Sequence, residues 1–390
     1  MAVLTLVRPQ SVDAARTFYV SSAGRDSAPG TTSDGAWRSV RRVNGAHLRP
    51  GDVIKFEGGR VFADQPLSPR RSGTERKPIT FTSYGRGQAT LFNEQGAVFI
   101  PEGVSHLRFR RLQLSSGASS QSSAFSSSAT GPGAKDIRLE HCLIFASGGA
   151  GILSKLPTDT DWRITDSVVR EIGDSGIILF GSRPVVADTL IENVGRNASI
   201  SWAKHGIYVK APYAVIRDST IEGYPDSGIS LRFRGAKVES NRISGGHIGV
   251  SYFLYDDGFA TSVLEDNTIT DTRTAGFYYD GTGAGAGAGL TPREAFEIRG
   301  NVFSAKDGVG LAIGYARNAR ISIVKNRFEG LASGSIFAVA SADGGRYVEK
   351  ENLFVGDPRF NWNGRLLTFP EYRASSGAGK RDRVIAARGG

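Results

Sequence analysis

Two cations occupy equivalent places in neighbouring repeats of the chain and could together grip one anionic ligand. Lys210 ends the phrase HGIYVK, and Arg232 ends the phrase SGISLR. If each phrase is an extended strand, and if the strands lie side by side about 4.8 Å apart, both charges face the same small region. Arginine can hold a carboxylate through paired hydrogen bonds, and a lysine near other cations can serve as a base. The pair therefore predicts a site for an anionic substrate on one face of a sheet.

Further polar and aromatic side chains surround this pair along the chain. His205 is a rival base, and Tyr208 could donate a proton to a leaving group. Candidates for substrate binding lie on or near the rims of the same strands, and they are Lys204, Arg234, Tyr252, Tyr255, Asp256, Asp257, Tyr278 and Asp280. A groove with several cations, several tyrosines and a few carboxylates suits an acidic polysaccharide or oligosaccharide.

Two repeated phrases supply the strands that would hold these residues. One phrase places a small or amide side chain at intervals of 22 to 34 residues, at Cys142, Ser167, Thr189, Ser219, Asn241, Asn267, Asn301, Asn326 and Asn352. The other phrase, a glycine followed by an apolar residue, recurs with a similar spacing from Gly151 to Gly310. Between them lie short segments of alternating apolar and polar residues, which are typical of strands. This pattern predicts a parallel β-solenoid.

The two phrases are expected to have structural roles. An asparagine that turns inward can hydrogen-bond to its copies in the coils above and below, and so satisfy turn backbone that would otherwise be buried unpaired. The apolar residue after each glycine is expected to point into the core, at Ile177, Ile207, Ile229, Val250, Phe277 and Leu311.

The ends of the chain depart from the repeat. Residues 1–16 are expected to be a signal remnant or a disordered leader, and residues 17–372 a single β-helix domain of about ten coils. Within it, residues 17–60 are expected to form an N-terminal cap made of a strand, a short helix ending near Leu48 and a second strand. Residues 373–390 are rich in Ser, Gly, Ala and Arg, which predicts a flexible basic tail.

Composition narrows the classes of function. The 390 residues include 48 basic and 38 acidic side chains, which gives a net charge of +10 and favours an anionic partner. The single cysteine, Cys142, excludes an internal disulfide. No apolar run is long enough to insert into a membrane, and no motif for binding a nucleotide or nucleic acid is present.

The N-terminal phrases FYVSSAGRDSAPGT, WRSV and LRPGDVIKFEGG, with the later HGIYV, DSGISL and SNRISGG, carry a family resemblance. They resemble secreted right-handed parallel β-helix proteins of the pectin-lyase-like superfamily over about residues 17–360. The resemblance implies that fold, and a protein that is secreted or held at the cell surface. Members include polysaccharide lyases, inverting glycoside hydrolases, uronate epimerases, phage tailspikes and adhesive proteins.

Three functions follow from the resemblance. Lyases similar to the alginate and chondroitin type place a Lys and an Arg on adjacent coils, as Lys210 and Arg232 are placed here, and this favours β-elimination of a uronate-containing glycan. An inverting glycosidase would instead use Asp256 or Asp257 with Asp280. A tailspike-like solenoid would bind a glycan in the same groove without cleaving it.

The same family resemblance leaves open whether the protein binds a metal ion. Those lyases usually add a calcium ion, Ca²⁺, held by several carboxylates or amides near the Lys and Arg pair. The nearest carboxylates in this sequence are Asp174, Glu192, Glu222 and Asp226, which form no convincing cluster. No cofactor is therefore assigned from the sequence.

Overall fold

A computed structural model gives the architecture of the chain. It describes a nearly continuous series of segments, namely residues 14–197, 203–253, 260–280, 295–305, 307–315, 319–330, 337–341, 346–377, 379 and 381–387. Within these segments no helix is long and apolar enough to cross a bilayer.

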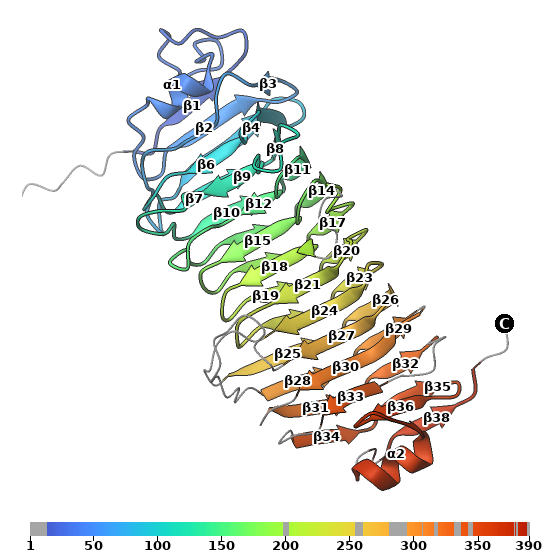
Figure 1. Cartoon of the computed structure of the whole chain (residues 1–390). Coiled ribbons are helices and arrows are strands. Elements are labelled where there is room, and N and C mark those ends of the chain that lie inside the picture. The colour runs from blue at the N-terminus through green and yellow to red at the C-terminus, as the bar shows by residue number, and fades with distance from the viewer. Residues whose placement is uncertain are drawn as a thin grey trace, which may run out of the picture.

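Three parallel sheets run the length of the molecule and wind into a solenoid (Figure 1). Sheet A has 13 strands from β1 (Thr17–Val20) to β34 (Arg346–Lys350), and sheet B has 13 strands from β3 (Val61–Phe62) to β38 (Arg383–Ile385). In the described residues, sheet C has 12 strands, and its one antiparallel pair there is β36 (Arg359–Trp362) with β37 (Arg365–Thr368). The predicted right-handed parallel β-helix is confirmed.

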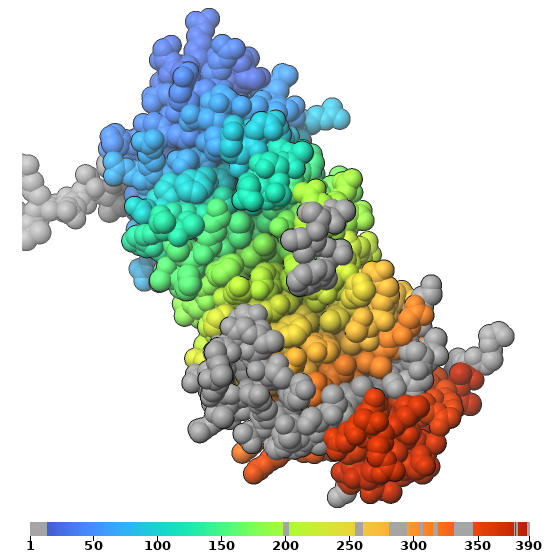
Figure 2. Space-filling view, viewed as in Figure 1, coloured from blue at the N-terminus to red at the C-terminus, as the bar shows by residue number. Residues whose placement is uncertain are grey.

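Sheet C faces the viewer in Figures 1 and 2 and carries the residues singled out by the sequence. Each of its strands follows a turn from sheet B and leads through a second turn into sheet A. Before β36 and β37 its strands are β6 (Val98–Ile100), β9 (Phe125–Ser127), β12 (Ile152–Leu153), β15 (Ile177–Phe180), β18 (Ile207–Lys210), β21 (Ser227–Leu231), β24 (Ile248–Phe253), β27 (Ala275–Asp280), β30 (Val309–Tyr315) and β33 (Phe337–Ser341).

The core is built by alternation along these strands. In β18, Ile207 and Val209 are buried whereas Tyr208 and Lys210 are only partly buried, since successive side chains of a strand point to opposite faces. All six side chains predicted to follow a glycine into the core are at most 3% exposed. The regular period of the sequence was therefore enough to assign the inner face of sheet C.

The asparagine ladder lies at the turn between sheets A and B and is confirmed. The backbone N–H of Asn241 donates to Oδ1 of Asn267 at 2.9 Å, and the backbone N–H of Asn267 donates to Oδ1 of Asn301 at 2.9 Å. Earlier coils use hydroxyls in the same place, as where the backbone N–H of Cys142 donates to Oγ of Ser167 at 3.1 Å. Each rung satisfies a buried donor that the turn would otherwise leave unpaired.

The N-terminal elements are part of the β-helix. Strand β1 pairs in parallel with β2 (Val53–Glu57), so the predicted cap region is itself part of sheet A, and the solenoid has more coils than the ten expected. The helix is shorter than predicted: α1 spans Val40–Asn44, because Trp37 is tied by backbone pairing to Val20.

The C-terminal end differs from the predicted flexible tail. Helix α2 (Phe369–Ser376) covers the last coil, and the ring of Tyr372 stacks on Phe360 with centroids 4.3 Å apart. Strand β38 then pairs with β35 (Leu353–Val355) in sheet B. The carboxylate of Asp382 takes the next place in the ladder, since it accepts the backbone N–H of Asn352 at 2.8 Å. These elements cover the end of the core, as solenoid ends require.

Candidate functional site

The ring of Tyr208 lies at the centre of a cluster on the outer face of sheet C. Lys210 Nζ lies 5.4 Å from the ring centroid, and the guanidinium carbon of Arg232 lies 4.9 Å from it. The imidazole of His205, in the turn that leads into β18, lies 5.0 Å away between centroids. The four residues predicted to do chemistry therefore lie together around one ring. Their roles stay a prediction.

Aromatic rings hold the two cations in place. Lys210 Nζ also lies 5.3 Å from the ring of Phe180, its neighbour in the register of β15 and β18. Arg232 lies between Tyr208 and the ring of Phe253, whose centroid is 4.7 Å from the guanidinium carbon. A cation over the face of an aromatic ring is attracted by the negative potential of that face, so these rings stabilise the positions of both cations.

Arg232 is more buried than its place on an outer face suggested. The residue is 9% exposed, because the two rings cover it. Its Nη1 donates to Oγ of Ser230 at 2.7 Å and to the carbonyl of Leu231 at 3.0 Å. Ser230 in turn shares a hydrogen bond of 2.9 Å with Ser251. The guanidinium is thus held in one orientation before any ligand arrives.

A carboxyl group from the next coil faces the buried histidine. Asp226 Oδ2 lies 3.2 Å from Nδ1 of His205, within ion-pair distance but without the alignment of a hydrogen bond. Burial, with a further contribution from the charge on Arg232, lowers the pKa of His205 to about 3. Burial also raises the pKa of Asp226 to about 6, although Arg232 and Ser227 act in the opposite direction. A neutral imidazole therefore faces a carboxyl group that keeps its proton to unusually high pH.

Sequence reasoning considered Asp226 only as a calcium candidate. The signal that could have found it is positional: Asp226 stands two residues before Gly228, as Lys204 stands two residues before Gly206. Both glycines lie at the entrance of a sheet C strand, so the residues before them line equivalent turns of two adjacent coils.

Two predicted binding residues are buried in structural roles. Lys204 is 7% exposed, and its Nζ donates to the carbonyls of Gly173 at 3.2 Å and Asn197 at 3.0 Å. Tyr252 is 1% exposed, and its hydroxyl donates to the carbonyl of Phe233. The alternation of β24 accounts for Tyr252, since it pairs in register with the inward Leu231. Neither side chain is placed to touch a ligand on the outer face.

The other predicted residues lie farther along the strands. Tyr278 is half-buried against Phe253, with centroids 5.4 Å apart, and Asp280 is the register partner of Phe253. Arg234 lies over the ring of Tyr213, 6.0 Å from its centroid. The remaining candidates, Tyr255, Asp256 and Asp257, lie outside the described residues.

The described carboxyl groups Asp226 and Asp280 do not lie close to each other. From Asp226 to Asp280 the register spans two strand spacings and about six residues along the strand, or roughly 20 Å. Across the described segments, no group of three or more His, Cys, Asp or Glu side chains is arranged to hold a metal ion. The four calcium candidates, Asp174, Glu192, Glu222 and Asp226, accordingly form no cluster of that kind.

Comparisons with known proteins agree with this architecture. Residues 150–328, which include the whole cluster around Tyr208, match the family model described as a right-handed beta helix region. The structure of XylC in complex with xylose has a TM-score of 0.62 and 8% identity, over 96% of this chain and 86% of that one. The chain is therefore a right-handed parallel β-helix, with residues 150–328 matching that family model.

Two further similarities involve named enzymes. The β-helix resembles lacto-N-biosidase from Eubacterium ramulus with a TM-score of 0.54 and 17% identity, covering 87% of this chain and 68% of that one. It also resembles the A-module of the mannuronan C-5 epimerase AlgE4 from Azotobacter vinelandii, with a TM-score of 0.51 and 14% identity over 87% and 91% of the two chains. At these identities the likeness concerns the fold.

One curated relative is similar in sequence over a short stretch. A lacto-N-biosidase from Bifidobacterium longum is 41% identical over 73 residues, which is 18% of this chain and 5% of that protein. The aligned stretch thus spans a small part of the relative's length.

Proposed function

We propose that this protein is a carbohydrate-active enzyme that cleaves an acidic glycan by β-elimination on the outer face of sheet C. The observation that carries the proposal is the placing of Lys210 and Arg232, from adjacent coils, on the single ring of Tyr208. Action on a polymeric glycan implies that the protein works outside the cell or at its surface.

Each group has a role in the proposed reaction. Arg232 pairs with the uronate carboxylate and stabilises the negative charge that develops when the C5–H bond breaks. Lys210 takes the C5 proton, and the electron pair forms a C4–C5 double bond as the C4–O bond breaks. The departing oxygen receives a proton from Tyr208, whose ring lies under both cations. The fixed orientation of Arg232 supports this role, because a preformed grip needs no rearrangement during the reaction.

Hydrolysis is a second candidate, favoured by the raised pKa of Asp226, about 6. A carboxyl group that holds its proton near neutral pH can act as the general acid of a glycosidase. The similarity to lacto-N-biosidases supports this alternative. It also requires a second carboxylate that activates water, for which the sequence offers Asp256 or Asp257.

A panel of alginate, polygalacturonate, hyaluronan, chondroitin, glucuronan and neutral glycans separates the candidates. Elimination produces new ultraviolet absorbance from the C4–C5 double bond, together with reducing ends. Reducing ends without that absorbance would indicate hydrolysis and overturn the lyase proposal. Binding without cleavage would indicate a non-catalytic glycan-binding solenoid.

A further inference from the structure

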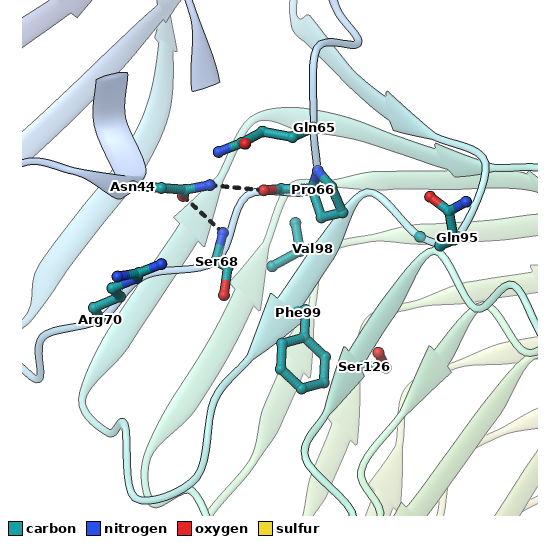
Figure 3. A pocket seen from close by; sticks show the side chains of 10 residues that line it. Asn44, Gln65, Pro66, Ser68, Arg70, Gln95, Val98, Phe99 and Ser126 are labelled. Carbon is teal, nitrogen blue, oxygen red and sulfur yellow. Dashed lines mark hydrogen bonds between the residues drawn. The ribbon is translucent and has the colours of Figure 1, made fainter. Parts of the chain in front are cut away.

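A pocket lies at the N-terminal end of sheet C, away from the cluster around Tyr208. It has a volume of about 370 Å³ and lies between the end of α1, the segment 65–70 and strands β6 and β9 (Figure 3). The ring of Phe99 forms part of its wall and is 38% exposed, which is unusual for a large apolar side chain of this protein. The pocket therefore offers an aromatic surface to solvent.

Polar side chains without partners line other walls of the pocket. Within the described residues, the side chains of Gln65, Arg70, Gln95 and Ser126 make no hydrogen bond or ion pair. The wall behind them is fixed, because the Asn44 amide donates to the carbonyl of Pro66 at 2.9 Å and accepts the backbone N–H of Ser68 at 2.8 Å, as Figure 3 shows. A pocket that combines an apolar ring with amides and one cation on its other walls suits a stretch of glycan, whose sugar rings have apolar faces and polar edges.

Phe99 also belongs to the same outward column as Tyr208. The register pairs Phe99 with Ser126, then Leu153, Ile178 and finally Tyr208, one residue in each successive strand. Four strand spacings separate the two rings, or about 19 Å. Because one strand spacing is close to the length of a sugar unit, a glycan lying along this column would reach Phe99 about four units away from Tyr208.

We propose that the pocket at Phe99 is a remote subsite for the same acidic glycan that binds at Tyr208. Phe99 stacks on one sugar ring, while Gln65, Gln95 and Arg70 bind hydroxyl and carboxylate groups of the adjoining units of the same chain. This inference rests on the proposed function for its substrate class. It adds that the enzyme gains affinity from long chains, since a short oligosaccharide bound at Tyr208 would not reach Phe99.

Size-fractionated uronate oligosaccharides and the intact polymers of the panel test the subsite. Wild type, Phe99→Ala and Arg70→Ala are compared with Val348→Ala, a matched control that removes an exposed apolar side chain, 54% exposed, from sheet A. The two readouts are kcat/KM and retardation by the polymer in native gels. Phe99→Ala is expected to lower polymer affinity roughly tenfold while leaving fragments of about two to three units unaffected, and Val348→Ala is expected to change neither.

The outcomes distinguish the subsite from the proposed function. If wild type cleaves polymers and Phe99→Ala and Arg70→Ala bind and cleave them equally well, the subsite is wrong and the function stands. An equal loss on short and long substrates would also overturn the subsite. If wild type binds a polymer without cleaving it, and Phe99→Ala weakens that binding, the subsite stands and the enzymatic proposal fails. Absence of binding to every glycan overturns both.

Discussion

His205 Nδ1 lies 3.2 Å from Asp226 Oδ2, across two adjacent coils at the entrance to sheet C. Burial disfavours charge on both partners, and the nearby Arg232 disfavours it further on the imidazole. The pair is therefore uncharged in mildly acidic solution, and Asp226 ionises as the pH rises through about 6. This makes Asp226 a proton donor at the entrance to sheet C, within the electrostatic influence of Arg232.

The first prediction concerns the pH profile. If Asp226 is the general acid of the hydrolytic candidate, kcat should fall as the pH rises through about 6, and Asp226→Asn should lose activity together with that limb of the profile. Asp188→Asn, which changes a surface ion pair with Arg217, is the control. An unchanged limb in Asp226→Asn would assign the acid to Tyr208 or another group.

The same shift predicts a change in stability. The folded pKa of Asp226 exceeds its unfolded value of 3.8, so the folded state binds more protons between the two. The contribution of Asp226 to the free energy of unfolding is therefore largest below pH 3.8, and it decreases as the pH rises to about 6. The lowered pKa of His205 acts in the opposite direction over this range, because stability then rises with pH. Denaturant unfolding should therefore show a steeper rise of stability with pH in Asp226→Asn, which lacks the opposing contribution of Asp226, than in wild type.

Lys210→Ala should abolish turnover and leave the fold intact. The side chain lies over two rings on the outer face, so its removal should cost under about 1 kcal/mol of stability. Loss of a positioned general base lowers the rate by about two to four orders of magnitude. Lys55→Ala is a matched control, because Lys55 Nζ lies over the ring of Tyr19 at 5.6 Å on sheet A. Full activity in Lys210→Ala with none in His205→Ala would make His205 the base.

Arg232→Lys should fail although it keeps the charge. An ammonium group cannot lie flat between Tyr208 and Phe253 while also donating to Ser230, so the carboxylate grip loses its orientation. We expect kcat/KM to fall at least tenfold, the scale of one charge-assisted hydrogen bond at about 1.5 kcal/mol. The control Arg110→Lys alters an exposed pair with Glu140 and should retain activity. Equal losses in both variants would contradict the role of Arg232.

The features that sequence reasoning predicted correctly are those that depend on local period. Alternation fixes which residues of a strand point inward, so Ile207 and Ile229 were assigned to the core from the recurring glycine–apolar phrase alone. Alternation does not say what lies beside an outward side chain. The burial of Arg232 depends on Tyr208 and Phe253, one coil to either side, and could not be derived from its own strand.

Breaks in the repeat hid other features. Asp382 continues the ladder 30 residues after Asn352, but it is an acid within a segment whose composition indicates flexibility. Tyr252 was assigned to the rim, although the alternation of β24 places it on the inner face, between Ser251 and Phe253 of the outer face. Its pairing with the inward Leu231 agrees with this.

Asn267→Ala should destabilise the protein strongly. Its side chain accepts from the backbone N–H of Asn241 at 2.9 Å and donates to the carbonyl of Val238 at 2.8 Å, both buried. Each group left unpaired costs about 1 to 3 kcal/mol. The next residue, Thr268 at the start of β26 (Thr268–Thr272), is half-buried, so Thr268→Ala is the control for denaturant unfolding. A variant as stable as that control would contradict the structural role of the ladder.

The last prediction concerns the C-terminal end of the solenoid, where Glu349 is 5% exposed and accepts the hydroxyl of Tyr372. Burial, reinforced by the charge on Asp382, raises the pKa of Glu349 to about 8. Burial also raises the pKa of Asp382, which Arg373 partly offsets. These contacts link β34 to α2 and to the turn before β38, so ionisation of Glu349 places an unfavourable charge among all three.

The sign follows from the folded pKa lying above the unfolded value of 4.5. The stabilising share of Glu349 is full below 4.5 and is lost as the pH rises to about 8. Glu349→Gln keeps an acceptor for Tyr372 but cannot ionise, so it should remove this loss. Hydrogen exchange of residues 369–377 is the readout, and it should speed up from pH 5 to pH 8 beyond the intrinsic rate in wild type but not in Glu349→Gln. Glu351→Gln, whose ion pairs with Lys325 and Arg381 are exposed, is the control and should behave as wild type. Exchange in Glu349→Gln that still accelerates in the same way would show that another group governs the C-terminal cap.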